Sequence, residues 1–214
     1  MTMTAVHGIG AHVRAVTPTA ARAQADFRVL LDVLSRPGTL GAVGRGDGPA
    51  AIAVAAGLAD VEVPTSVLTG PGDEHWANAL HLATSAPPAP LETARMVVAL
   101  RPPSPAEIAG LTRGDALHPE HGTRLIAAVT TLEPPDTPGA GVVLGLSGPG
   151  VPGARRIRVT GLPGAVFAAL AEANAAFPAG VDTFLVAQDG TVAGLPRSTR
   201  IEIEDTGNLM NGEH

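Results

Sequence analysis

The segment FPAGVDTFLVAQDGTVAGLPRSTRIE, residues 177–202, carries the strongest structural signal in the chain. Two apolar runs, Thr183–Ala187 and Val192–Leu195, flank Asp189-Gly190, and Asp-Gly between such runs is typical of a tight hairpin turn. Another strand is expected at Arg200–Ile203. The segment therefore predicts a β-hairpin that is followed, after a short polar turn, by one more strand.

Helices and strands alternate along the rest of the chain. The stripe of Phe27, Leu30, Leu31 and Leu34 predicts an amphipathic helix that starts at Thr17-Pro18 and stops at Ser35–Gly38. Further helices are expected at Ala50–Ala59, Asp73–Thr84, Ala106–Leu111 and after Pro163, and strands at Thr39–Val43, Val61–Leu68, Met96–Leu100, Leu125–Leu132, Val142–Ser147 and Arg156–Thr160. Such alternation indicates an α/β or α+β protein with a mixed sheet.

No linker divides this pattern, so residues 17–204 are expected to form a single domain. Residues 1–16 have weak periodicity and are expected to form a loose N-terminal arm. Residues 205–214 are polar and are expected to form a flexible C-terminal tail. Pro64 interrupts the predicted strand 61–68, which favours an edge position or a bulge.

The composition excludes several kinds of chemistry. The chain has no cysteine, so it holds no zinc–thiolate site and no Cys-ligated iron–sulfur cluster. All 14 basic residues are arginine, so no lysine is present to form a Schiff base with pyridoxal phosphate. A net charge of −6 with 2% aromatic residues argues against nucleic-acid binding. The longest apolar run, about ten residues, is too short for a membrane span of about twenty. A cytoplasmic protein without a cofactor is expected.

Two motifs are weak candidates for a site. Gly145–Gly150 reads GLSGPG, which is typical of a tight turn, although backbone N–H groups in such a run and the nearby Arg155 offer a minority interpretation as an anion site. His118 and His121 flank Pro119-Glu120 and have metal-ligand chemistry, but a third ligand is lacking and Pro119 breaks any helix. A solvated loop is the preferred interpretation, and no metal site is expected.

The turn before the last strand is the better candidate. Arg197-Ser198-Thr199-Arg200 places two guanidinium groups and two hydroxyls together. Such a set can bind phosphate bidentately, or Arg197 can pair with Asp182 in a structural ion pair or a subunit contact. The ligand or interface candidates are therefore Arg197, Thr199, Arg200, Asp182 and Arg155. No Ser, His or Asp occurs in a recognisable catalytic motif, so no catalytic residue is predicted.

Several segments resemble one family when they are taken in order. They are DFRVLLDVLSRPG at 26–38, Ser85–Pro87, Gly114–Leu125, LSGPGV at 146–151, and a final pattern made of Phe177, Pro178, Gly180, Asp182, Leu185, Pro196, Arg197 and Thr199. From about residue 26 to residue 202 the chain is similar to the H subunit of bacterial carbon–phosphorus lyase, the PhnH family. The histidines at 118 and 121 are not part of that pattern.

The resemblance implies an α/β fold similar to the large domain of pyridoxal-phosphate-dependent transferases but without that cofactor. It also implies assembly with the G, I and J subunits, which together exchange the adenine of ATP for a phosphonate and form ribose 1-alkylphosphonate 5-triphosphate. A homodimer is expected in isolation. Because no catalytic set is recognisable, the leading hypothesis is a structural subunit without its own catalytic centre. The alternative is a phosphate- or nucleotide-binding module that contributes arginines to a shared site.

Overall fold

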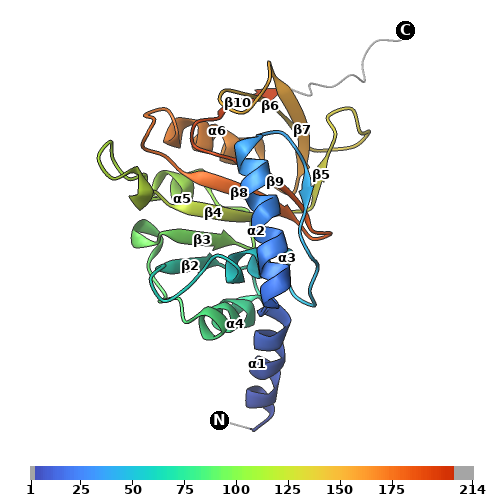
Figure 1. Ribbon diagram of the computed structural model, residues 1–214, viewed down its shortest axis with the longest axis vertical. Coiled ribbons are helices and arrows are strands. Elements are labelled where there is room, and N and C mark those ends of the chain that lie inside the picture. The colour runs from blue at the N-terminus through green and yellow to red at the C-terminus, as the bar shows by residue number, and fades with distance from the viewer. Residues whose placement is uncertain (1–2, 205–214) are drawn as a thin grey trace.

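The computed structural model describes residues 3–204, so the tail expected at 205–214 lies outside the described residues. This part of the chain contains two β-sheets and six α-helices, and it is an α/β protein. Its elements form layers (Figure 1). A six-stranded sheet lies in the middle, four helices cover one face, and two helices with a second sheet cover the other.

The six-stranded sheet is mixed and has the order β1-β9-β8-β4-β3-β2. The strands β2, β3, β4 and β8 run parallel, whereas β9 and β1 are antiparallel to their neighbours. The bounds are β1 Gly41–Ala42, β2 Thr65–Leu68, β3 Met96–Ala99, β4 Arg124–Val129, β8 Asp182–Ala187 and β9 Thr191–Leu195. The expected hairpin is confirmed as β8 and β9. The expected strand 61–68 is shorter, because β2 begins only after Pro64, and it lies at the edge of the sheet, which was one of the two alternatives.

A second, antiparallel sheet corrects the expectation of one mixed sheet. Its order is β10-β6-β7-β5, with bounds β10 Arg200–Glu204, β6 Val142–Ser147, β7 Arg155–Thr160 and β5 Thr131–Glu133. The expected strand Leu125–Leu132 divides at Thr130, whose N–H donates to the carbonyl of Thr160 at 2.9 Å. Gly161 fits here because a Cβ would lie 2.7 Å from the Thr130 nitrogen and its φ is +92°. The chain therefore bends from one sheet into the other.

Four helices pack on one face of the central sheet. They are α1 Met3–Val16, α2 Ala20–Ser35, α3 Ala50–Ala56 and α4 Glu74–Thr84. Leu30 and Val33 of α2 are buried with Ile52 of α3 and Leu80 of α4, against strand residues such as Val98. Figure 1 shows α2 lying across the near face of the sheet, with α1 continuing beyond it beside α4. These helices bury the apolar side of each parallel strand, as a parallel sheet requires.

The helix α1 replaces the expected loose arm. Val16 is 1% exposed, and Ile9 and Val13 pack against the same core. The rings of His12 and His75 lie with their centroids 4.3 Å apart, between α1 and α4. Gly8 and Gly10 weaken the helix propensity locally. The spacing of Ile9, Val13 and Val16 at i, i+4 and i+7 is typical of an amphipathic helix, which explains why a helix and not a loose arm forms here.

The opposite face carries α5 Pro105–Ala109, α6 Gly164–Ala173 and the antiparallel sheet. Phe167 and Leu170 of α6 are buried with Leu185 of β8 and Leu144 of β6. Two short 3-10 helices, Leu91–Thr93 and Pro119–His121, lie in the connections. No helix in residues 3–204 is long and apolar enough to cross a membrane.

The start of α2 differs from the expectation by two residues. The N-cap is Thr19, whose hydroxyl accepts a hydrogen bond from the Arg22 N–H at 3.3 Å. The hydroxyl of Thr17 donates instead to the carbonyl of Val13 at 2.7 Å, at the end of α1. Two threonines therefore serve two different helix ends, which a single Thr-Pro signal did not separate.

Candidate functional site

The β8–β9 hairpin brings the two ends of the opening segment together. Thr183 is opposite Leu195 in the antiparallel register, so Asp182 at the start of β8 lies beside Arg197, just after β9. The N–H of Arg197 donates to Asp182 Oδ1 at 2.9 Å, and its Nη2 donates to Oδ2 at 2.6 Å. This ion pair, expected as one alternative from the sequence, is confirmed.

Arg197 has further partners in two other loops. Its Nη1 donates to the carbonyl of Pro119 at 2.5 Å and lies 3.4 Å from the carbonyl of Pro178. The side chain is 13% exposed. Since Nε also contacts both oxygens of Asp182, every nitrogen of the guanidinium group has an acceptor. The arginine therefore fixes the hairpin to the loops at 119 and 178, and each nitrogen of its guanidinium group already has at least one acceptor.

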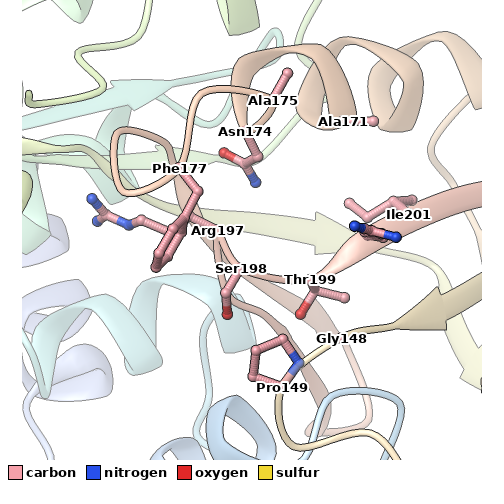
Figure 2. Close-up of a pocket in the computed structure, with 11 residues that line it drawn as sticks. Gly148, Pro149, Ala171, Asn174, Ala175, Phe177, Arg197, Ser198, Thr199 and Ile201 are labelled. Carbon is pink, nitrogen blue, oxygen red and sulfur yellow. The ribbon is translucent and has the colours of Figure 1, made fainter. Parts of the chain in front are cut away.

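A pocket of about 510 Å³ lies next to this arginine. Figure 2 shows Phe177, Asn174, Ser198, Thr199 and Pro149 around it. The lining residues are Gly148, Pro149, Ala171, Asn174, Ala175, Phe177, Arg197, Ser198, Thr199, Arg200 and Ile201. The pocket has the size of a site for a small organic ligand, which typically occupies roughly 300–1,000 Å³. Three of the residues predicted from the sequence, Arg197, Thr199 and Arg200, meet here.

The hydroxyl of Thr199 is the unusual polar group of this pocket. Thr199 is 4% exposed, and its Oγ1 has no hydrogen-bond partner among the described residues. In Figure 2 the hydroxyls of Ser198 and Thr199 both point toward Pro149, while the guanidinium group of Arg197 points away from them. A buried hydroxyl without a partner destabilises the fold by about 1–3 kcal/mol. The free cationic group of the pocket is Arg200, which is exposed and has no side-chain partner in residues 3–204.

Two further lining residues, Asn174 and Phe177, were not among the site candidates from the sequence. Asn174 is 8% exposed, and its amide group exchanges hydrogen bonds with the backbone of Val181 at 2.7 and 3.2 Å. Phe177 is 64% exposed and forms an aromatic wall. An Asn directly after a helix and before a Phe-Pro-x-Gly loop was the available signal, because such an amide commonly ties a loop to its own backbone. Asn174 therefore shapes the pocket with its hydrogen bonds already made.

Arg155 does not line this pocket. It starts β7 opposite Leu146, and a Cβ added at Gly38 would lie 2.7 Å from the Cβ of Arg155. Its Nη1 lies 3.5 Å from the carbonyl of Arg36. The segment Gly145–Gly150 is confirmed as the end of β6 and a turn toward β7, with φ of +122° at Gly148. Arg155 therefore packs on the end of α2, away from the Thr199 hydroxyl.

The two histidines of the loop after α5 lie side by side. The rings of His118 and His121 are stacked with centroids 5.1 Å apart, and both are about half exposed. Pro119–His121 is a single 3-10 turn, as a proline inside the motif would suggest. Within residues 3–204, no group of three or more His, Asp or Glu side chains is arranged to hold a metal ion.

The fold and the site together define an α/β protein in which Arg197 forms a structural ion pair with Asp182 and a pocket of the size of a small ligand lies beside it. The family model described as bacterial phosphonate metabolism protein (PhnH) matches residues 15–202, and the chain therefore belongs to the PhnH family. No curated protein sequence gives a significant match. Family membership implies a role in bacterial phosphonate metabolism.

Proposed function

We propose that the chain is a non-catalytic subunit of a carbon–phosphorus lyase core complex, in which it assembles with the G, I and J subunits. Membership of the PhnH family supports this context. The observation that supports the structural role is that each guanidinium nitrogen of Arg197 already donates to Asp182 or to the carbonyl of Pro119. An arginine that binds a reacting phosphate group needs a pair of N–H groups that are free to donate to it, and the guanidinium group of Arg197 is already bound to other acceptors.

Co-expression tests this role directly. The chain should co-purify with the G, I and J subunits, and the complete set should convert ATP and an alkylphosphonate to ribose 1-alkylphosphonate 5-triphosphate. Omission of this chain should lower the yield of the assembled complex together with its activity. Full activity of a complex of G, I and J alone would contradict the proposal, as would failure of this chain to co-purify when the other three assemble.

A homodimer in isolation is part of the same proposal, and α2 offers a surface for it. Its exposed side carries Phe27, 46% exposed, and Leu31, 52% exposed. Ala20, Ala23, Phe27, Leu31 and Leu34 recur at spacings of three or four residues, which is the pattern of a helix–helix seam. We call these five residues the α2 seam. The same helix on a second copy would cover the seam symmetrically.

The fold relation to pyridoxal-phosphate-dependent transferases and the cytoplasmic location remain proposals. The mixed sheet of parallel strands with an antiparallel edge supports the first. Because the chain has no lysine, it cannot form an internal aldimine. Titration with pyridoxal phosphate should therefore leave the absorption spectrum of the cofactor unchanged, and a new band typical of an aldimine would contradict this expectation.

A second candidate function rests on the 510 Å³ pocket. The unpartnered Thr199 hydroxyl, the free Arg200 and the exposed Phe177 ring together suit a nucleotide, whose phosphate would meet Arg200 and whose base would stack on the ring. Calorimetric titration with ATP tests it. Arg200→Gln should abolish the heat, with Arg28→Gln as control because Arg28 is an exposed arginine on α2. If the native protein gives no heat at millimolar ATP, the nucleotide-binding function is contradicted and only the assembly role remains.

A further inference from the structure

A second hollow lies on the other side of Arg197, at the amino ends of β3, β4 and β8. Its lining residues are Val63, Arg95, Glu120, Gly122, Arg124, Asp182 and Arg197, and its volume is about 290 Å³. We call it the β-edge pocket. Three arginines and two carboxylates meet here, in a chain whose net charge is −6. Neither Arg95 nor Arg124 was a candidate from the sequence.

The backbone holds Arg95 and Arg124 next to each other. The N–H of Arg124 donates to the carbonyl of Arg95 at 2.9 Å, where β4 begins beside β3. The preceding residue, Thr123, is fully buried, and its hydroxyl donates to the carbonyl of Ala94 at 2.9 Å. Both arginines therefore project from a fixed sheet edge, so their backbone positions are set before any ligand arrives.

The carboxylates of the pocket do not neutralise these two arginines. Asp182 is directly beside Arg124 in the parallel register, but both of its oxygens accept hydrogen bonds from Arg197. Glu120 is 62% exposed, and its Oε1 lies 3.7 Å from Nε2 of His121. Within residues 3–204, neither Arg95 nor Arg124 has a carboxylate within 4.0 Å. Two guanidinium groups therefore face the pocket without a partner of opposite charge.

We propose that the β-edge pocket binds a small oxyanion that carries about two negative charges, of the phosphate or phosphonate class. Each guanidinium group presents a planar fork of donors that matches such an anion bidentately. A phosphate group carries roughly −1.5 to −2 at pH 7, more than a carboxylate, so it is attracted more strongly to a pocket in which arginines outnumber carboxylates. The volume of about 290 Å³ is at the lower end for ligand sites, which favours a small ion over a whole nucleotide.

Glu120 provides a second prediction, opposite in direction to that for the two arginines. Its carboxylate lies at the rim of the pocket and repels an incoming anion, so its removal should strengthen binding. Arg95→Gln and Arg124→Gln should weaken binding, each by about tenfold, because each removes one charge-assisted pair. Arg124→Lys keeps the charge without the fork and should weaken binding less than Arg124→Gln. The loss in Arg124→Lys, which keeps the charge, distinguishes a built site from general attraction to a charged surface.

The experiment is a calorimetric titration of the full chain with inorganic phosphate, methylphosphonate and ATP, each at constant ionic strength. Binding of phosphate or methylphosphonate that Arg95→Gln and Arg124→Gln weaken, and Glu120→Gln strengthens, is the expected result. Stronger binding of ATP through the same two arginines would identify the anion as the phosphate chain of a nucleotide. Unfolding in urea should show that the variants are about as stable as the native chain, since Arg95 is exposed and Arg124 is only half-buried.

Arg28→Gln is the matched control, because Arg28 is an exposed arginine on α2 that lines neither pocket. It should leave phosphate binding unchanged. Loss of phosphate binding in Arg200→Gln with retention in Arg95→Gln and Arg124→Gln would overturn the proposal, and so would the absence of phosphate binding in the native chain. The proposal does not depend on the assembly role, because co-purification with the other subunits is measured separately.

Discussion

Arg197 contacts both carboxylate oxygens of Asp182, and the backbone N–H of the arginine adds a further hydrogen bond at 2.9 Å to Oδ1. The pair joins the start of β8 to the turn that leads into β10. It also separates the two hollows, because Arg197 lines both. The Asp182–Arg197 ion pair therefore lies between the larger pocket, which contains Arg200, and the β-edge pocket, which contains two further arginines.

Removal of this carboxylate should destabilise the fold. Asp182→Ala leaves Arg197, which is 13% exposed, without its charged partner, and we expect a loss of about 2–3 kcal/mol in the free energy of unfolding. Urea unfolding measures it. The control is Glu204→Ala, which breaks the more exposed pair with Arg156 and should change stability by less than about 1 kcal/mol. Equal losses in the two variants would show that the Asp182 pair is not structural.

Two buried threonines should respond differently to the same substitution. Thr199→Val removes a hydroxyl that has no partner among the described residues, so stability should stay within about 0.5 kcal/mol of the native value or rise. Thr123→Val removes a hydroxyl that donates to Ala94 at 2.9 Å, which should lower stability by about 1–3 kcal/mol because an acceptor is left unpaired. Chemical denaturation of both variants makes the comparison. A larger loss in Thr199→Val would mean that its hydroxyl has a structural partner.

Acid should remove the contribution of the Arg101–Glu107 ion pair to the free energy of unfolding. The hydrogen bonds from Arg101 lower the pKa of Glu107 from 4.5 to about 2, with a further contribution from the Ser104 N–H. Because the folded-state pKa is depressed, the ion pair stabilises the fold above pH 4.5, and this contribution is lost as the pH falls toward 2. Arg101 is 39% exposed, so solvent screening limits the effect to about 1–2 kcal/mol.

The measurement compares unfolding free energies of the native chain and Glu107→Gln between about pH 6 and about pH 2. The difference between them should be largest at the upper end of this range and should shrink as the acid form of Glu107 appears. Glu92→Gln, an exposed carboxylate on the neighbouring 3-10 helix, is the control and should show little difference at any pH. A gap between native and Glu107→Gln that stays constant throughout the acid range would contradict the assignment.

Self-association through the α2 seam is tested by charge. Leu31→Glu places a carboxylate in the middle of the apolar surface and should convert a dimer to a monomer in sedimentation experiments. Leu82→Glu on α4 is the matched control, because Leu82 is 63% exposed and lies outside the seam. A dimer that survives Leu31→Glu would place the interface elsewhere. If the same seam meets the G, I or J subunit, Leu31→Glu should also reduce co-purification.

Local signals were sufficient to predict most of the elements. The Asp-Gly turn predicted the hairpin, Pro64 was consistent with an edge strand, and Pro163 predicted the start of α6. The division into two sheets escaped prediction because Leu125–Leu132 is continuously apolar apart from threonines. The bend at Thr130 depends on Gly161, which is distant in the sequence and meets it only in the folded chain.

The candidate site was predicted in part, for a similar reason. Asp182 and Arg197 were paired from the sequence, since a hairpin brings its own ends together. Arg95 and Arg124 belong to parallel strands, which have no short-range signal of adjacency because a crossover connection separates them. Thr199 was predicted as a ligand candidate, but the burial of its hydroxyl without a partner among residues 3–204 follows from tertiary packing, which has no local signal in the sequence.

The place of β10 has a consequence for how the protein is made. It pairs with β6 from Arg200 opposite Ser147 to Glu204 opposite Val143, so the antiparallel sheet receives its outer strand long after β6 is synthesised. A nascent chain on the ribosome therefore exposes the edge of β6 until almost all of the described chain has emerged. An unpaired edge recruits other strands. A premature stop codon before Arg200 should accordingly yield aggregates rather than a shortened folded chain.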